Sequence, residues 1–538
     1  MAGRIKSWNS GEPSAWAGAL GLVDVPLFGQ GCQVGGGRHF LLRDGSRASF
    51  ALFTDCDAAI EDDETLSWAW SANVRHSIYV GKDTRRVLLR RWDIPGSVRR
   101  FRLESSDGAR ELLDILEASR PARSPDVIAR VMEAFWQIRS ALNEPTESLN
   151  ALNILLLAVR EVAVGQLRET RLRECRTFGE VLRQLPEQLR LNTGISNLPE
   201  AVEDTSLDVL LSFFLDPAPH NRCRLRADLL FRHAASQLYQ EAHFQLERTS
   251  QTSFTGMSPP PLHGRGPRDV RYTPTNLARA LVDRVMDRIP PSSRGNRLVI
   301  MDPACGSGVF LQECLAAAVR RGRPERLELH GIDISGISKS IAESCLYLAK
   351  MDLGGAADVD WQIDNANALD KQWDQSDIIL MNPPFRAWQD MDGDEQRRVG
   401  TCLGEMMRGR ADLALAFLWK AFRSLKPGGL MAVVLPAALL DNESGKNLRQ
   451  ELARVGNILL IGKFEGFSYF SSSLVETAFV VLAKPSEPGG FRRDVELLVA
   501  SEGSEDEALR VLRGASEFAG VTRRVELFGS SGESVGEF

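Results

Sequence analysis

The sequence lacks the residue patterns that mark a zinc site, a secreted chain or a membrane span. Its eight cysteines include no C-x-x-C pair and its seven histidines show no ligand spacing, so we expect no bound metal. Scattered cysteines are typical of a reducing compartment, which predicts a cytoplasmic protein. The longest apolar runs, such as residues 151–164, are too short and too charged to cross a bilayer, and residues 1–10 lack the apolar core of a signal peptide. We therefore expect no membrane partner.

The chain also lacks an excess of basic residues. Its formal net charge is −6 and its isoelectric point is about 5.8, whereas nucleic-acid binders usually carry a basic footprint. A basic groove in one region is compatible with this average, so the charge alone excludes no nucleic-acid function. With 538 residues, 43% of them hydrophobic and 25% charged, the chain has an ordinary globular composition and room for two to four domains.

The pattern of apolar residues divides the chain into five regions. Residues 1–108 form a β-rich N-terminal region, and its strand-like runs lie at 39–43, 48–53, 77–80 and 85–92. Residues 109–248 repeat apolar positions every three or four residues, which predicts a helical domain that serves as a scaffold. Residues 249–268 are rich in Ser, Thr, Pro and Gly and are interpreted as a linker. A catalytic domain over 269–484 and a tail over 485–538 complete the division.

Residues 269–484 alternate short apolar runs with helical stretches. The runs expected to be strands lie at 298–301, 328–332, 359–363, 377–381, 430–435, 458–461 and 474–483. This alternation predicts an α/β fold with a parallel, doubly wound, Rossmann-like sheet of seven strands, preceded by a mixed β/α region. The tail mixes strand-like runs with acidic and Gly/Ser-rich breaks, and its sequence does not decide whether it folds.

A glycine-rich turn follows the first of these strands, in the sequence Asp302-Pro-Ala-Cys-Gly-Ser-Gly. Gly306 and Gly308 allow a sharp turn and a close approach of the backbone to a ligand. The helix that follows presents free N–H groups suited to a carboxylate, while Asp302 can bind an ammonium group. Asp333, at the end of the second strand, is placed to accept ribose hydroxyls. The turn and Asp333 together indicate a nucleoside cofactor, and the missing G-x-G-x-x-G argues against a nicotinamide.

The candidate catalytic loop is Asn382-Pro383-Pro384-Phe385, directly after the fourth strand. The Asn382 side-chain oxygen and the Pro383 carbonyl can each accept a proton of a planar amino group, so that its lone pair points at an activated methyl group. Two prolines fix the direction of that carbonyl, and Phe385 offers a face on which an extruded base stacks. No covalent nucleophile is needed, and Cys305 is interpreted as a packing residue. The alternative is a Pro-Pro turn with Phe385 in the core, which the cofactor turn upstream disfavours.

These motifs, in this order, resemble those of the gamma-type N6-adenine DNA methyltransferases, including the modification subunits of type I restriction systems and related phage-defence methylases. The resemblance covers about residues 269–484 and includes Asp412-Leu413 before a helix and Leu435-Pro436 at a strand end. It implies S-adenosylmethionine as cofactor, and it implies that the residues binding it are Tyr272, Thr273, Pro274, Asp302, Ala304, Gly306, Gly308, Asp333 and Asn367.

The resemblance also concerns the target and the partners. It implies double-stranded DNA as substrate, with the adenine flipped out and packed against an aromatic side chain near the seventh strand. Phe470 is the first candidate for that side chain and Phe467 the second. It further implies a restriction-modification or phage-defence role, in which separate specificity and nuclease subunits are possible partners.

The chain departs from the family at two points. Asn367 stands where the family usually has an Asp that contacts the cofactor's adenine amino group, with Asp364 and Asp370 as nearby substitutes. An Asn carbonyl still accepts a hydrogen bond, so we expect weaker charge assistance rather than loss of the site. In addition, the family's target-recognition domain normally follows the last catalytic strand or comes from a partner subunit, and only about fifty residues remain here.

Three alternatives stay open. Methylation of an RNA guanine-N2 amino group or of a protein glutamine uses a similar Asn-Pro-Pro loop, although the Tyr272-Thr273-Pro274 segment argues against both. A weakly active DNA-binding or assembly subunit with the same fold is the third.

Two charged features of the first region allow more than one interpretation. The acidic run over residues 55–64 lacks the E-x-K pattern of a nuclease and is better explained as a solvated loop. The arginine pairs at 85–86, 90–91 and 99–100 could contact phosphates, or could lie on an exposed strand face.

Overall fold

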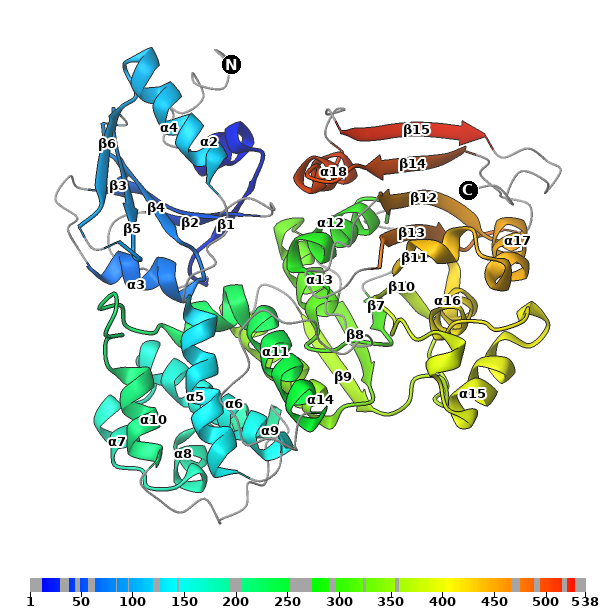
Figure 1. Ribbon diagram of the computed structural model, residues 1–538, viewed down its shortest axis with the longest axis horizontal. Helices are drawn as coiled ribbons and strands as arrows, with labels where there is room; N and C mark the ends of the chain where they lie inside the picture. Colours follow the sequence, from blue (N-terminus) through cyan, green and yellow to red (C-terminus); the bar gives the residue numbers. More distant parts are fainter. Residues whose placement is uncertain are drawn as a thin grey trace. The chain divides into compact units, whose positions relative to one another are not determined.

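The structure of the protein is a computed structural model. It describes residues 12–29, 38–43, 49–56, 63–83, 85–94, 96–119, 126–142, 145–192, 206–251, 273–289, 297–322, 326–353, 358–465, 475–487, 494–514 and 520–527. The chain divides into two compact units, the first made of Met1–Leu246 with Gly256–Leu262 and the second of Glu247–Thr255 with His263–Phe538 (Figure 1). Each unit has its own sheet and its own hydrophobic core.

The first unit begins with a six-stranded sheet whose strands follow one another in chain order. The strands are β1 (Val23–Pro26), β2 (Arg38–Arg43), β3 (Phe50–Cys56), β4 (His76–Gly81), β5 (Arg86–Arg91) and β6 (Val98–Arg102). Neighbours are antiparallel except β3 and β4, which are parallel and have helix α3 (Asp63–Ser71) between them in the chain. Helices α2 (Pro13–Leu20) and α4 (Ser106–Ala118) pack on one face through Trp16 and Leu112. The four runs predicted as strands overlap β2, β3, β4 and β5.

The remainder of the first unit is helical, which agrees with the apolar period of three to four residues. The helices are α5 (Val127–Ala141), α6 (Pro145–Ala163), α7 (Glu169–Arg173), α8 (Phe178–Gln184), α9 (Glu187–Asn192), α10 (Ser206–Leu215) and α11 (Ala227–Gln251). Asp126 and Thr177 begin α5 and α8 by accepting backbone N–H groups of the first turn. The ring of His233 in α11 contacts the Leu27 carbonyl oxygen at 2.7 Å and so links helices and sheet. Residues 252–268 of the predicted linker lie outside the described residues.

The second unit is built on a nine-stranded sheet. Its strands are β7 (Arg297–Asp302), β8 (Arg326–Asp333), β9 (Val359–Asn365), β10 (Ser376–Met381), β11 (Leu425–Pro436), β12 (Asn457–Phe464), β13 (Thr477–Ala483), β14 (Asp494–Ala500) and β15 (Val521–Leu527). Their order is β15-β14-β12-β13-β11-β10-β7-β8-β9. The seven predicted strands are confirmed as β7 to β13. The sheet is mixed rather than wholly parallel, because β13 runs antiparallel to both β11 and β12.

Two strands from the tail extend the predicted sheet. β14 pairs in parallel with β12, and β15 pairs antiparallel with β14. Glu496 of β14 is buried and is ion-paired with Arg284 on the one hand and with Arg523 of β15 on the other. A buried carboxylate needs such partners to offset the loss of hydration. The tail therefore belongs to the same sheet and is connected to its helical cover.

Helices cover both faces of this sheet (Figure 1). One layer contains α12 (Thr275–Met286), α13 (Val309–Arg320), α14 (Gly336–Asp352) and α18 (Glu505–Leu512), and the other contains α15 (Gly393–Leu403), α16 (Leu413–Ser424) and α17 (Lys446–Val455). Short turns of 3-10 helix lie at Trp388–Asp390, Gly404–Met406, Ala437–Leu440 and Glu443–Gly445. In β10, Ile378 and Leu380 enter one core cluster while Ile379 and Met381 enter the other. Burial on both faces explains why the strand is an unbroken apolar run.

Candidate active site

The predicted site segments meet at one edge of the second sheet. β7 ends at Asp302, β8 ends at Asp333, and β10 ends directly before Asn382. These strands are parallel neighbours in the order β10-β7-β8, so their carboxyl ends lie along the same edge. The strand order reverses between β7 and β10, because the chain adds β8 and β9 on one side before it returns to the other. Open α/β sheets bind ligands in the crevice at such a reversal.

The glycine-rich turn between β7 and α13 has the backbone that its sequence predicts. Gly306 and Gly308 have φ angles of 52° and 79°, in the left-handed region that favours glycine. A Cβ atom on Gly308 would lie 3.2 Å from the Cβ of Ala342, so the turn also packs tightly against α14. Gly308 precedes the first residue of α13, and the free N–H groups of that helix therefore begin at the turn.

Asp333 connects the end of β8 to the glycine-rich turn. Its carboxylate accepts a hydrogen bond from the Gly306 N–H at 3.0 Å and another from the Ser335 N–H at 2.8 Å. Burial raises the pKa of Asp333, against the opposing effect of these hydrogen bonds. Each carboxylate oxygen can accept more than one hydrogen bond, so both oxygens keep capacity for a ligand hydroxyl. Asp333 therefore shapes the site and remains able to bind there.

Asp302 is the more deeply buried of the two carboxylates. Its side chain accepts the Ala304 N–H at 3.1 Å, and the residue is only 2% exposed. Burial raises the pKa of Asp302 to about 8, and the nearby charge of Asp333 adds to that effect. No Lys or Arg of the described residues forms an ion pair with either carboxylate. The turn therefore suits a cationic ligand, since a positive charge would compensate both groups.

The candidate catalytic loop leaves the sheet from a buried position. Asn382 is 8% exposed and Pro383 is buried, whereas Pro384 and Phe385 are half-buried. Phe385 packs against the core cluster that contains α12 and α13. The core position that the alternative interpretation gave to Phe385 is thus partly realised, but the ring keeps some exposed surface. Phe385 can therefore pack against the core and still offer a surface on which a base stacks.

The residues after the loop are held by the helices that follow. Arg386 accepts the N–H of Leu413, the first residue of α16, at 3.0 Å through its carbonyl oxygen. Its guanidinium group is ion-paired with Glu395 of α15 and donates to the carbonyl of Asp390 at 2.7 Å. These contacts fix the exit of the loop, so Asn382 and Pro383 are anchored by β10 on one side and by Arg386 on the other.

Other predicted cofactor residues fall near this edge or outside the described residues. Thr273 is buried and Pro274 precedes α12. The Asn367 side-chain oxygen accepts the Leu369 N–H at 3.0 Å, which closes the turn after β9. One acceptor position of that oxygen is therefore used locally, which the sequence did not reveal. Tyr272, Phe467 and Phe470 lie outside the described residues.

Ile334 is a candidate that the sequence analysis missed. It follows Asp333 directly and is 75% exposed, unusual for a large apolar side chain. The side chain of Asn365 donates to the carbonyl oxygens of Ile334 at 2.8 Å and of Asp333 at 3.2 Å, which holds this backbone in place. An exposed apolar group beside a possible ribose site is suited to contact a nucleobase. Its position in the sequence, directly after the acidic residue that ends β8, could have identified it.

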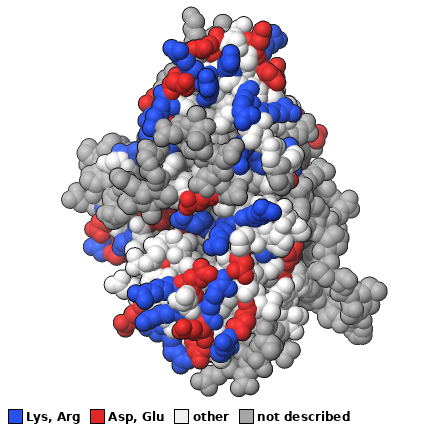
Figure 2. Space-filling view, turned by 90° about the vertical axis from the view of Figure 1, so that its left-hand side faces the viewer, with Lys and Arg blue, Asp and Glu red and all other residues white. Residues whose placement is uncertain are grey.

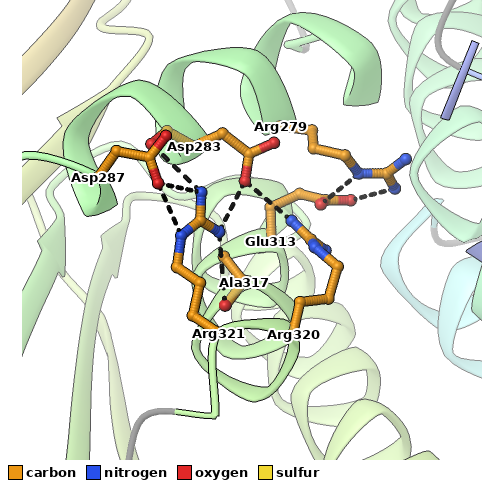
Figure 3. A network of polar contacts seen from close by, with 7 residues as sticks. All are labelled: Arg279, Asp283, Asp287, Glu313, Ala317, Arg320 and Arg321. Carbon is orange, nitrogen blue, oxygen red and sulfur yellow. Dashed lines mark hydrogen bonds and ion pairs between the residues drawn. The ribbon is translucent and has the colours of Figure 1, made fainter. Parts of the chain in front are cut away.

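A network of ion pairs joins the two helices that begin at the site (Figure 3). Arg279 of α12 and Glu313 of α13 form two hydrogen bonds of 2.7 and 2.8 Å, and their side chains are only 6% and 9% exposed. Toward the other end, Asp283 of α12 contacts both Arg320 and Arg321. Because α12 follows Thr273-Pro274 and α13 follows the glycine-rich turn, the network fixes these two segments relative to each other.

Among the described residues, no group of three or more His, Cys, Asp or Glu side chains could hold a metal ion. Among the same residues, no helix combines the length and the apolar character needed to span a membrane.

Comparison with known proteins gives a family match within the second unit and similarity to several methyltransferases. Residues 269–513 match the family model described as N-6 DNA Methylase. The chain is 28% identical over 221 residues to the type II methyltransferase M.BanIII of Aneurinibacillus aneurinilyticus, a match that covers 39% of this chain and 37% of that protein. It is 34% identical over 189 residues to the type I restriction enzyme EcoEI methylase subunit of Escherichia coli, covering 34% and 35%. The chain thus spans little more than a third of the length of these relatives.

Among solved structures, the chain is similar to a class I S-adenosylmethionine-dependent methyltransferase from Listeria monocytogenes. The sequence identity is 15% and the TM-score 0.40, with 69% of this chain and 99% of that chain covered.

Proposed function

We propose that the chain transfers the methyl group of S-adenosylmethionine to N6 of adenine in DNA, which the match of residues 269–513 to the family model described as N-6 DNA Methylase supports. The observation that carries this proposal is the meeting of two carboxylates, the buried Asp302 and the half-buried Asp333, with the Asn382-Pro383 loop at one sheet edge. The carboxylates suit a cationic nucleoside, and the loop supplies acceptors for an amino group. A substrate-activating loop beside a cation-binding turn is what methyl transfer to a nitrogen requires.

The residues at the edge fit S-adenosylmethionine part by part. Asp302 would bind the ammonium group, the N-terminus of α13 the carboxylate, and Asp333 the ribose hydroxyls. Ile334 would pack against the adenine ring, and Asn367 would contact its amino group. When bound, the cofactor supplies a methyl group that is activated by a sulfonium charge.

The catalytic loop acts on the amino group of the target base. The Asn382 side-chain oxygen and the Pro383 carbonyl would each accept one of its protons, which directs the nitrogen lone pair toward the methyl group. Phe385 would stack on the base once it has left the duplex. The loop positions and polarises the amino group, and no side chain forms a covalent intermediate. Cys305 agrees with this, because burial raises the pKa of its thiol well above the ordinary value.

The test is methyl transfer from labelled S-adenosylmethionine to duplex DNA, with the product nucleoside identified by mass spectrometry. We expect N6-methyladenine from the wild type and at least a hundredfold lower rate from Asn382→Ala, with cofactor binding by calorimetry little changed. N2-methylguanine in RNA or methylated glutamine as the only product would contradict the proposal in favour of the other two reactions. Equal transfer by both proteins would contradict the role of Asn382.

The proposed function also suggests protein partners for this chain. The EcoEI relative is named as a methylase subunit, which indicates an assembly for that protein. We propose that a specificity subunit selects the DNA sequence for this chain and that a nuclease subunit completes a restriction system. The rate of transfer to a specific site should then rise when the products of the neighbouring genes are added, and an unchanged rate would argue for a chain that selects its own site.

A further inference from the structure

The β5–β6 hairpin of the first unit carries a concentration of arginine. Residues 82–102 include eight Lys or Arg and only two Asp, within a chain of net charge −6. Most of these residues belong to β5 and β6, and β6 is the edge strand of its sheet. In Figure 2, which looks at the side on which this sheet lies, the upper part shows Lys and Arg side chains with Asp and Glu side chains between them. The basic character is therefore local and is hidden by the average composition.

The strand register places four arginines on one face, and three of them are exposed while Arg90 is half-buried. Arg86 lies opposite Arg102, and Leu88 lies opposite Arg100, so these four side chains share a face of the β5–β6 hairpin. The opposite face, with Val87 and others, packs into the core under α2 and α4. We call Arg86, Arg100 and Arg102 the arginine face. All three are exposed, and like charges directly across two strands destabilise the pair.

The arginines around this face are neutralised where the chain provides an acid. Arg85 is ion-paired with Glu104, and Arg91 shares Asp93 with Arg75. No acidic side chain among the described residues forms an ion pair with the three arginines of the arginine face. The hairpin thus carries three exposed arginines on one face that have no acidic partner among the described residues.

Protection of a sheet edge is the competing explanation. Natural edge strands carry charges that prevent pairing with another chain. That role would need charges on β6 alone, but Arg86 belongs to β5, which has neighbours on both sides. A matched row of positive charges across two strands instead complements a row of negative charges.

We propose that the arginine face binds the phosphate backbone of duplex DNA, as a second contact outside the methyl-transfer site. The partner rests on the proposed function, since that function supplies DNA as substrate. Arginine forms bidentate contacts with phosphate, and contacts of this type position a protein without reading sequence. The arginine face raises affinity for any duplex and does not select the methylated site.

Salt dependence of DNA binding measures these contacts directly. Each phosphate contact adds about 0.9 to the slope of log affinity against log salt, so three contacts add about 2.7. The variant R86Q/R100Q/R102Q should lower the slope by that amount. Between 50 and 200 mM salt, the wild type should lose about 40-fold more affinity than the variant. Fluorescence anisotropy with the full chain and a short labelled duplex gives both numbers.

A control variant removes the same charge elsewhere. Arg176, Arg297 and Arg454 have side chains that are 67%, 62% and 71% exposed, and each is ion-paired with an acid. R176Q/R297Q/R454Q should therefore leave the salt slope unchanged. An equal reduction by both variants would show a general charge effect and overturn the proposal. The proposal would also be overturned if the wild type did not bind duplex DNA. The same holds if R86Q/R100Q/R102Q lost binding to phosphatidylserine vesicles but kept the wild-type binding to DNA.

A second measurement needs no variant and covers the case of poor folding. Phenylglyoxal modifies accessible arginines, and DNA should protect Arg86, Arg100 and Arg102 of the wild type while Arg454 reacts as before. Equal reaction with and without DNA would refute the arginine face. This outcome can be distinguished from that of the proposed function. If DNA protects the three arginines but no N6-methyladenine forms, the arginine face is supported and the proposed function fails. If N6-methyladenine forms without protection, the proposed function is supported and the arginine face fails.

Discussion

Replacement of Glu313 by Gln would leave the Arg279 guanidinium group buried without its counter-charge. Both side chains are more than nine-tenths buried and share two hydrogen bonds of 2.7 and 2.8 Å. Breaking such a pair by removing one partner costs about 3–5 kcal/mol, because the remaining charge is not hydrated. An exposed pair such as Arg454 with Glu451, in which the arginine is 71% exposed, contributes only about 0–1 kcal/mol.

Hydrogen exchange followed by mass spectrometry is the suitable assay. The chain has two compact units, so a single global unfolding free energy is poorly defined, whereas exchange reports local opening of each helix. Glu313→Gln should lower the opening free energy of α12 and α13 by about 3–5 kcal/mol. Exchange in α6 of the first unit should not change, and Glu451→Gln provides the exposed control.

The double replacement R279M/E313L separates a buried charge from a packing defect. With both charges gone, two apolar side chains of similar volume fill the space, and the stability should return to near the wild-type value or exceed it. A double variant as unstable as Glu313→Gln, or a single variant that loses less than about 1 kcal/mol, would refute the reasoning.

Two further predictions concern the cofactor turn. Burial raises the pKa of Asp302 to about 8 from an ordinary 3.8. Between pH 3.8 and about pH 8 the folded chain therefore binds more protons than the unfolded chain, and its stability falls as the pH rises. Asp302→Asn should flatten the dependence of stability on pH, as measured by thermal unfolding. The affinity of the wild type for S-adenosylmethionine should rise with pH as Asp302 ionises, and calorimetry should show no such rise in the variant. Unchanged pH dependence in both assays would reject the assignment. Gly308→Ala should lose about 1–2 kcal/mol through left-handed strain and bind the cofactor more weakly. Gly322→Ala, also at positive φ but with open space around its Cβ, should lose stability without loss of binding, and equal binding losses in the two variants would contradict the role of the turn.

The strands of the second sheet were predictable where both faces are buried. Ile378 to Met381 form an unbroken apolar run because helices cover each side, and such runs are visible in any sequence. β14 was not visible in the same way, since Glu496 interrupts its apolar run. That carboxylate is tolerated only because Arg284 and Arg523 reach it, and both partners are distant in sequence or lie in the next strand. A sequence pattern cannot show a long-range ion pair.

The candidate site shows the same limit. Asp302, Asp333 and Asn382 were predicted as strand-end residues, and the strand order explains why they meet. Ile334 was missed because an apolar residue in a strand-to-helix connection is ordinarily assigned to the core, and only its exposure reveals otherwise. The use of the Asn367 oxygen within its own turn likewise depends on backbone geometry rather than on residue type.

Glu496 also determines where the second unit can be cut. It connects the helix that follows Thr273-Pro274 with the last strand of the sheet. A fragment cut at residue 484 would remove Glu496, the ion-pair partner of Arg284, and would leave β12 with an open edge, which invites pairing between chains. A fragment of the second unit should therefore include β14 and β15, and a fusion to another protein should join beyond β15 rather than at residue 484.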